Sequence, residues 1–135
     1  MTTYLLDTNT VSHLLRSHVQ VSQRIQRVPM GSLGISAITE GELLFGLALR
    51  PAAHRLHRAV QEFLRRVDVL PWDSAVAARY GMVRAGLSGK GKAVAPLDLL
   101  IGCHALALGR VLVSSDRAFR NVEGLMLEDW AESPS

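Results

Sequence analysis

Short, unbroken apolar runs alternate along the chain with longer segments whose apolar residues recur every three or four positions. An unbroken run is typical of a strand buried on both faces, whereas the wider spacing is typical of a helix with one buried side. The runs predict strands at residues 4–6, 33–36, 67–70 and 111–113, with an edge strand at 125–127. The spaced segments predict helices at 11–15, 18–28, 38–49, 53–66 and 96–108, a helix that opens within 71–74 and runs to 87, and a helical turn from 115.

Strands that alternate with helices predict an α/β domain with a mostly parallel central sheet of four to five strands, flanked by helices. A chain of 135 residues suits a single domain spanning 1–135. In open parallel sheets, active sites lie just outside the carboxyl ends of the strands. The residues that directly follow each strand are therefore where chemistry is expected.

Composition narrows the class of protein further. Hydrophobic residues make up 48% of the chain and charged residues 20%, which favours a compact globular protein over a disordered one. No apolar stretch approaches the roughly 20 residues of a transmembrane helix, and no signal peptide is recognisable. The single cysteine, Cys103, cannot form an internal disulfide. We expect a cytoplasmic protein with no membrane contact.

The basic charge is concentrated in the first part of the chain. Residues 1–115 carry 13 basic and 7 acidic side chains, a net +6, and residues 116–135 carry two basic and five acidic ones, a net −3. A basic body favours a polyanionic partner such as RNA or DNA. A solvated basic surface without a partner is an equally simple interpretation of the charge alone.

Four carboxylates stand where a parallel sheet would bring them to one edge. Asp7 ends the first strand, Glu42 lies early in the helix after the second, and Asp116 follows the fourth. Asp98 lies in the first turn of the helix that starts at residue 96. Each acid has a structural alternative, because Asp7 and Asp116 could be helix N-caps, Thr39-x-x-Glu42 matches a capping box, and Asp98 suits the helix dipole.

Convergence of all four acids would need a further explanation, because clustered carboxylates repel one another unless a cation is present. Oxygen ligands without histidine or cysteine at ligand spacing favour Mg²⁺ or Mn²⁺ over zinc. A divalent ion beside a basic surface is suited to hydrolysis of a phosphodiester bond.

Four segments, LLDTNTVSHLL, ISAITEGELLFGL, APLDLLIGCHALALGRVLVSSDRAF and LMLEDW, carry a resemblance to a known family. Together and in this order they resemble the PIN-domain ribonucleases, and more narrowly the VapC-type toxins of bacterial toxin–antitoxin pairs. The resemblance implies a Mg²⁺- or Mn²⁺-dependent endoribonuclease, with tRNA among its candidate substrates. It also implies a homodimer, inhibition by a cognate antitoxin in a hetero-oligomer, and contact with operator DNA only through that antitoxin. A non-catalytic RNA-binding module that keeps the fold is the alternative.

The resemblance assigns catalysis and metal binding to Asp7, Glu42, Asp98 and Asp116. Three neighbours would orient these acids, namely Thr8, Asn9 and Ser114. The segment usually written T-N-D is Ser114-Ser115-Asp116 here, so Ser115 replaces an amide and its role is in doubt.

Three further basic residues precede the Asp98 segment and could guide an RNA backbone to the site: Arg84, Lys90 and Lys92. A flexible, solvated connection is the alternative. We expect His104 to be a core residue, Trp72 to pack at a helix start, and Trp130 to hold the last strand in place.

Overall fold

The computed structural model describes residues 1–132 and contains one five-stranded parallel sheet with strand order β3-β2-β1-β4-β5. The strands are β1 (Tyr4–Leu6), β2 (Leu33–Ser36), β3 (Asp68–Leu70), β4 (Val111–Val113) and β5 (Leu127–Glu128). The α-helices are α1 (Thr8–Leu15), α2 (Val19–Gln26), α3 (Ala37–Ala48), α4 (His54–Arg66), α5 (Ser74–Gly89) and α6 (Pro96–Leu108). Two short 3₁₀ helices, η1 (Met30–Ser32) and η2 (Arg117–Asn121), complete the described chain. The predicted α/β fold with a mostly parallel sheet is confirmed.

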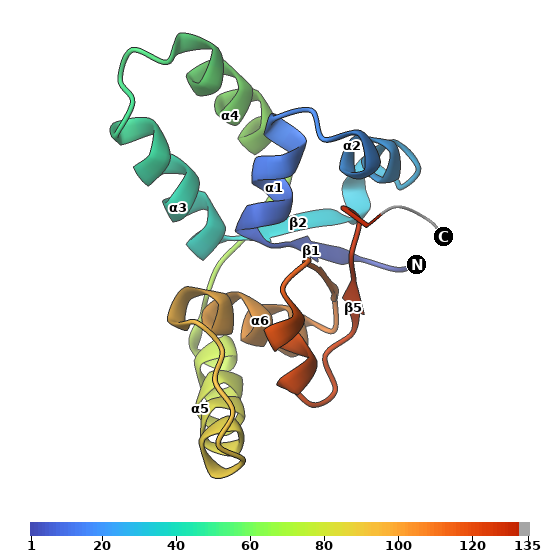
Figure 1. Ribbon diagram of the computed structural model, residues 1–135, viewed down its shortest axis with the longest axis vertical. Helices are drawn as coiled ribbons and strands as arrows, with labels where there is room; N and C mark the ends of the chain where they lie inside the picture. Colours follow the sequence, from blue (N-terminus) through green and yellow to red (C-terminus); the bar gives the residue numbers. More distant parts are fainter. Residues whose placement is uncertain (133–135) are drawn as a thin grey trace.

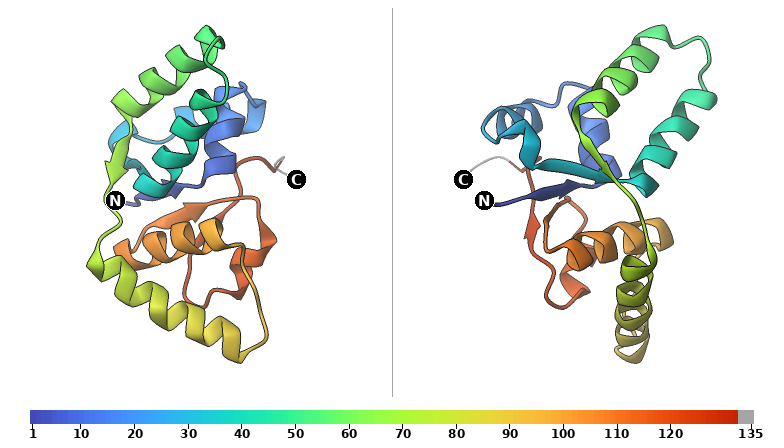
Figure 2. Two further views of the ribbon diagram at one scale, coloured as in Figure 1. Left: turned by 90° about the vertical axis from the view of Figure 1, so that its left-hand side faces the viewer. Right: turned by 180° about the vertical axis from the view of Figure 1, so that it is seen from behind.

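Helices cover both faces of the sheet (Figure 1). Helices α1 to α4 lie above the sheet in that view, and α5 and α6 lie below it, with the hairpin of α3 and α4 and the long α5 projecting in opposite directions (Figure 2). The pleat of β1 and β4 explains why both faces are covered, because successive side chains of a strand point to opposite faces of the sheet. Leu6 and Val113 join the core beneath α1 and α4, whereas Leu5 and Leu112 join the core against α6.

The two central strands are short and apolar because they are covered on both sides. Leu5 pairs with Gly34 of β2 and with Leu112 of β4, and Leu5 and Leu112 are fully buried. The apolar runs in the sequence therefore identified these strands correctly. Helix α6, apolar nearly all round, is buried as expected and ends at Gly109, which adopts the left-handed conformation with φ 67°.

Some element boundaries differ from the predictions, mostly because polar residues cap the ends. Helix α1 begins at Thr8 rather than at residue 11, because the Asp7 side chain accepts a hydrogen bond from the Thr10 N–H and starts the helix early. Strand β5 comprises only Leu127 and Glu128, so the strand predicted at 125–127 is displaced toward the C-terminus. Residues 1–132 include no helix with the length and hydrophobicity of a membrane span.

Candidate active site

Asp7 is held rigidly at the junction of the two central strands. Its backbone N–H donates to the Val113 carbonyl of β4 at 3.1 Å, and its Oδ1 accepts from the Thr10 N–H at 2.8 Å. The Thr10 hydroxyl donates to the same Val113 carbonyl at 3.0 Å. Asp7 is only 2% exposed, and the hydrogen bond from Thr10 makes it the N-cap of α1, as the structural alternative for this residue has it. The cap engages Oδ1, so the second carboxylate oxygen, Oδ2, remains available to bind a ligand.

Asp116 occupies the equivalent place after the neighbouring strand β4. The Ser114 hydroxyl accepts a hydrogen bond from the Asp116 N–H at 3.0 Å, and Asp116 Oδ1 accepts from the Ala118 N–H at 2.9 Å. Ser114 itself is fixed by its own N–H, which donates to the Glu128 carbonyl of β5 at 2.9 Å. Asp116 therefore caps η2, as predicted, while Ser114 sets the direction in which Asp116 leaves the strand.

Glu42 does not belong to a capping box. Helix α3 has Ser36 as its N-cap, so Thr39 lies inside the first turn and the capping-box interpretation is wrong. Instead, the Thr8 hydroxyl donates to Glu42 Oε1 at 2.7 Å and lies 3.1 Å from the buried Thr39 hydroxyl, which can donate back to it. Two threonines from different helices thus hold the Glu42 carboxylate.

Asp98 shows most directly that the four acids converge. Its pKa is raised from 3.8 to about 6, first by burial and then by the negative charges of Asp116, Asp7 and Glu42, with a further contribution from a hydrogen bond to the Asp116 side chain. Asp98 lies in the first turn of α6, where the helix dipole favours the ionised carboxylate. The pKa is raised nevertheless, so burial and the like charges outweigh the dipole.

The composition of this cluster suits a hard divalent cation. All the donors are carboxylate oxygens, supported by threonine and serine hydroxyls, which matches Mg²⁺ or Mn²⁺ chemistry rather than that of softer metals. Among residues 1–132, however, no three His, Cys, Asp or Glu side chains are grouped so that they could already hold a metal ion. The acids are close enough to raise the pKa of Asp98 but are not arranged as a closed cage.

The other predicted orienting residues differ in what they contact. The exposed Asn9 makes no hydrogen bond to any of the acids in the described part of the chain, so no contact supports its predicted role. Ser115 is also exposed, and its hydroxyl donates to Asp129 Oδ1 at 2.7 Å. It therefore ties the turn after β4 to the segment after β5 instead of facing the acids.

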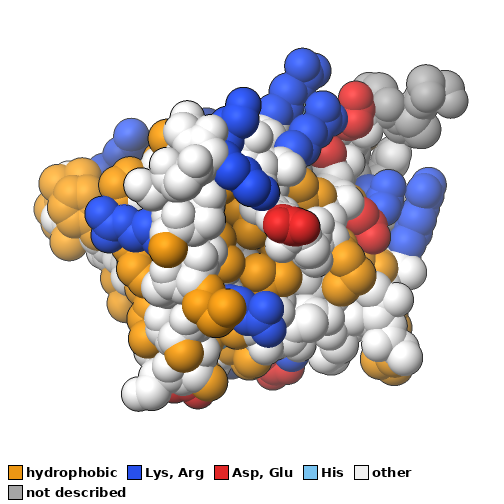
Figure 3. Space-filling view, turned by 90° about the horizontal axis from the view of Figure 1, so that it is seen from below, with side chains coloured by type: hydrophobic (Ala, Val, Ile, Leu, Met, Phe, Trp, Pro, Cys, Tyr) orange, Lys and Arg blue, Asp and Glu red, His pale blue; other side chains and the backbone are white. Residues whose placement is uncertain are grey.

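The three basic residues predicted to bind RNA separate into two places. Arg84 and Lys92 line an open hollow of about 190 Å³ that also reaches Leu99, the neighbour of Asp98. Lys90 lies 3.6 Å from the Glu123 carboxylate and lines a different hollow of about 260 Å³ between α5 and η2. Seen from below, Lys and Arg side chains are scattered over the upper half and both sides of the molecule, with single acids among them (Figure 3).

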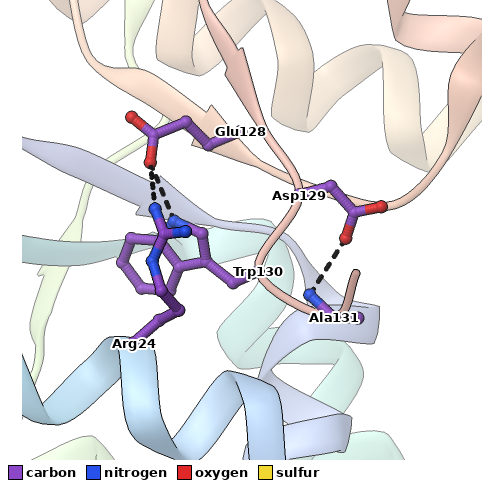
Figure 4. A network of polar contacts seen from close by, with 5 residues as sticks. All are labelled: Arg24, Glu128, Asp129, Trp130 and Ala131. Atoms are coloured by element: carbon purple, nitrogen blue, oxygen red, sulfur yellow. Dashed lines mark hydrogen bonds and ion pairs between the residues drawn. The ribbon is translucent and has the colours of Figure 1, made fainter. Parts of the chain in front are cut away.

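The C-terminal segment is fastened to the sheet next to the site (Figure 4). Trp130 is 1% exposed, and its Nε1–H donates to Glu128 Oε1 at 2.9 Å. Arg24 of α2 pairs with the same Glu128 oxygen at 2.9 Å and lies 5.5 Å from the centre of the Trp130 ring. The Tyr4 ring of β1 meets Trp130 edge to face at 5.1 Å. The predicted packing role of Trp130 is confirmed.

The remaining aromatic and histidine predictions also concern the core. The Trp72 Nε1–H donates to the Leu100 carbonyl at 3.0 Å, and its ring packs edge to face on Tyr80, as expected for a packing residue. His104 is fully buried in α6, with Nδ1 2.8 Å from the Ser36 hydroxyl, and burial lowers its pKa. It is a core residue, as predicted.

Comparisons with known proteins agree with this architecture. A family model described as PIN domain matches residues 4–125, and the chain belongs to the PIN-domain family. A tRNA(fMet)-specific endonuclease VapC of Shigella flexneri is 32% identical over 132 residues, which cover 97% of this chain and all of that protein. A Salmonella typhimurium protein of the same name is 33% identical, with 96% of this chain and 99% of that protein covered.

Solved structures give the same result. The crystal structure of DNA-bound VapBC from Salmonella typhimurium superimposes with a TM-score of 0.89 at 33% identity, over 96% of this chain and 99% of that one. VapBC-1 from nontypeable Haemophilus influenzae gives a TM-score of 0.86 at 29% identity, with 97% and 100% covered. The narrower resemblance to VapC ribonucleases is thus confirmed. PIN-domain nucleases generally depend on a divalent metal.

Proposed function

We propose that this chain is a metal-dependent endoribonuclease that acts as the toxin of a toxin–antitoxin pair. The observation that carries the proposal is the raised pKa of Asp98, whose causes include the charges of Asp7, Glu42 and Asp116. Three carboxylates from distant parts of the chain thus act on Asp98 at the carboxyl edge of a PIN-family sheet. A protein that only bound RNA would gain nothing from this concentration of negative charge facing phosphate.

In this proposal Asp7, Glu42, Asp98 and Asp116 hold Mg²⁺ or Mn²⁺. A divalent ion bound there supplies two things: it neutralises charge on the scissile phosphate and lowers the pKa of a water molecule. The chain's own residues set the positions of the ligands. Thr8 fixes the Glu42 carboxylate by the 2.7 Å hydrogen bond, and Ser114 fixes the backbone of Asp116. Such partners of metal ligands commonly influence activity by one to two orders of magnitude.

The proposed substrate is RNA, with tRNA as the first candidate because the Shigella flexneri and Salmonella typhimurium relatives are named tRNA(fMet)-specific endonucleases. The hollow lined by Arg84 and Lys92 supports this choice, since it places two cations next to the helix that carries Asp98. Lys90 contributes less in this proposal, because Glu123 already offsets part of its charge. Residues 1–135 would carry out this activity as a single PIN domain in the cytoplasm.

The proposed partners are a cognate antitoxin and a second copy of the chain. Helix α3 and its C-cap carry large apolar side chains that are widely exposed, namely Leu44 at 48%, Phe45 at 64% and the C-cap Leu49 at 65%. Exposed apolar surface of this kind is typical of protein interfaces. Structural neighbours include VapBC complexes bound to DNA, one of them a Rickettsia felis complex on a promoter fragment. We therefore propose a homodimer within a toxin–antitoxin hetero-oligomer, which reaches operator DNA through the antitoxin.

The test is RNA cleavage by purified protein freed of any partner. Total tRNA is incubated with Mg²⁺ or Mn²⁺, with EDTA, and with the variants Asp7→Asn and Asp68→Asn. Asp68 is exposed on β3, so its variant is the matched control for loss of one carboxylate. We expect discrete cuts that require the metal, disappear in Asp7→Asn and persist in Asp68→Asn. Salt-sensitive RNA binding without any cutting would support the non-catalytic module instead.

A further inference from the structure

We propose that Arg117 and Arg120 bind the phosphate backbone of the RNA on the Asp116 side of the acidic cluster. The inference rests on the proposed nuclease function and deepens it. Residues on α5 and the loop after it were expected to guide RNA toward Asp98, but nothing in the sequence pattern drew attention to η2. Three structural observations draw attention to η2. They are the spacing of its two arginines, the contacts that engage the surrounding acids, and the hollow that the arginines share with Asp116.

The register of η2 places the two arginines side by side. Residues three apart eclipse one another in a 3₁₀ helix, about 6 Å apart along its axis. Phe119 and Val122 point inward, at 0% and 4% exposure, while Arg117 and Arg120 are both exposed. The inward side is packed closely, since a methyl group added at Gly102 of α6 would come within 2.9 Å of the Phe119 ring. The two guanidinium groups therefore project from a firmly anchored turn.

Neither arginine has an acidic partner within residues 1–132. This is notable because acids are close by. Glu128 is already engaged by Arg24 and by the Trp130 ring N–H. Asp129 Oδ1 accepts from the Ser115 hydroxyl and from the Ala131 N–H. Figure 4 shows Glu128 turned toward Arg24 and Trp130, and Asp129 turned toward the Ala131 N–H. Glu128 and Asp129 are thus engaged by other groups, and neither forms an ion pair with Arg117 or Arg120.

The arginines share a hollow of about 300 Å³ with Asp116. Its wall also includes Ser114 and Ser115, so it opens directly from the carboxyl end of β4, where the acidic cluster lies. The acids Glu128, Asp129 and Glu132 also line the same hollow, so the two arginines are the groups in it that can attract a phosphate. A phosphate held at the cluster would have its neighbour along the strand within reach of this hollow. Guanidinium groups are suited to that neighbour, because their planar fork binds phosphate oxygens in pairs.

The RNA would then cross the cluster from one basic site to another. Arg84 and Lys92 lie next to α6, on the Asp98 side, and Arg117 and Arg120 lie on η2, on the Asp116 side. With cations on both sides, the phosphate between them is drawn to the acids despite their negative charge. The arrangement would give a role to two arginines that pair with no acid in residues 1–132.

The experiment compares three double variants on a short single-stranded RNA that contains a mapped cleavage site. Arg117→Gln with Arg120→Gln removes the proposed contacts, and Arg117→Lys with Arg120→Lys keeps the charge without the fork. Arg55→Gln with Arg58→Gln is the matched control, because both residues are exposed on α4 and lose the same charge. The readouts are KM and kcat for cleavage, and the salt dependence of binding in EDTA between about 50 and 200 mM salt.

We expect the glutamine variant at 117 and 120 to raise KM at least about tenfold, since each contact to a charged group is lost outright. The slope of log affinity against log salt should fall by about 0.7 for each phosphate contact removed. The lysine variant should keep the slope while KM stays raised, and the α4 control should match the wild type. Unchanged melting temperatures would show that all the variants are folded.

The inference is overturned if the glutamine variant matches the wild type in KM and slope, or if the α4 control loses as much. Its failure is distinguishable from failure of the proposed function. A wild-type protein that cuts no RNA with any metal refutes the nuclease, whereas the salt slope in EDTA still decides whether the two arginines contact RNA.

Discussion

Replacement of Asp98 by asparagine should abolish RNA cleavage and yet stabilise the metal-free protein. The carboxylate of Asp98 has its pKa raised to about 6 by burial and by the three neighbouring acids. A shift of roughly two pKa units corresponds to about 3 kcal/mol of unfavourable interaction for the ionised form at neutral pH. Because the side chain is partly exposed, screening by solvent reduces the expected gain to about 1–2 kcal/mol. Asparagine fits the same space without the charge.

The pH dependence follows from the direction of the shift. Below about pH 3.8, Asp98 is protonated in the folded and unfolded protein alike, so variant and wild type should be equally stable. The unfolded chain releases its proton first as the pH rises, and the folded wild type loses stability relative to the variant until about pH 6. Above that pH the difference should stay constant.

Thermal unfolding in EDTA between pH 4 and pH 8 measures this difference. At roughly 3–5 °C per kcal/mol for a chain of this size, Asp98→Asn should melt roughly 3–10 °C above the wild type at pH 7.5. The exposed Asp68→Asn variant should show no such gain. A variant no more stable than the wild type at pH 7.5, or a difference that does not change with pH, would refute the reasoning about the cluster.

Three other predictions follow from single contacts. Thr8→Val removes the hydrogen bond to Glu42 and should lower kcat for RNA cleavage about tenfold without loss of folding, so an unchanged kcat would show that Glu42 needs no such partner. Trp130→Ala should cost about 3–5 kcal/mol of unfolding free energy in a denaturant titration, and a loss below about 1 kcal/mol would contradict its role as a core residue. Burial lowers the pKa of His104, so the unfolded chain takes up the proton first and stability should fall as the pH drops below about 6.5. In an Asp98→Asn background, His104→Leu should remove that decline. If the decline persists, it belongs to another group.

Elements buried on both faces could be predicted from the sequence alone. Strands β1 and β4 lie between two layers of helices, so every one of their residues is apolar or nearly so and the pattern leaves no ambiguity. Strand β5 lies at the edge and has only two residues, both partly exposed, and its predicted position was displaced. Helix α4 was located although only Val60 of it is buried, because thirteen residues are enough to show a periodic apolar side, whereas a strand of two half-buried residues shows no pattern.

The acids were found from the sequence because each follows directly from a strand end or a helix start. Their supporting groups were found less completely. Thr39 was interpreted as a cap, because nothing in the sequence places it opposite Thr8, which is 31 residues away. The sequence predicts RNA binding at Lys90 but gives no sign of its ion pair with Glu123, because that pair joins segments that meet only in the folded chain. Contacts between distant segments depend on tertiary structure, which local patterns do not encode.

The attachment of β5 beside the acids makes the protein's activity sensitive to loss of its C-terminal end. The Glu128 carbonyl holds the N–H of Ser114, and Ser114 holds Asp116. A protease that trimmed the chain back to Met126 would remove none of the four acids. It would nevertheless release Ser114 and uncover the core beneath Trp130, and so inactivate the protein.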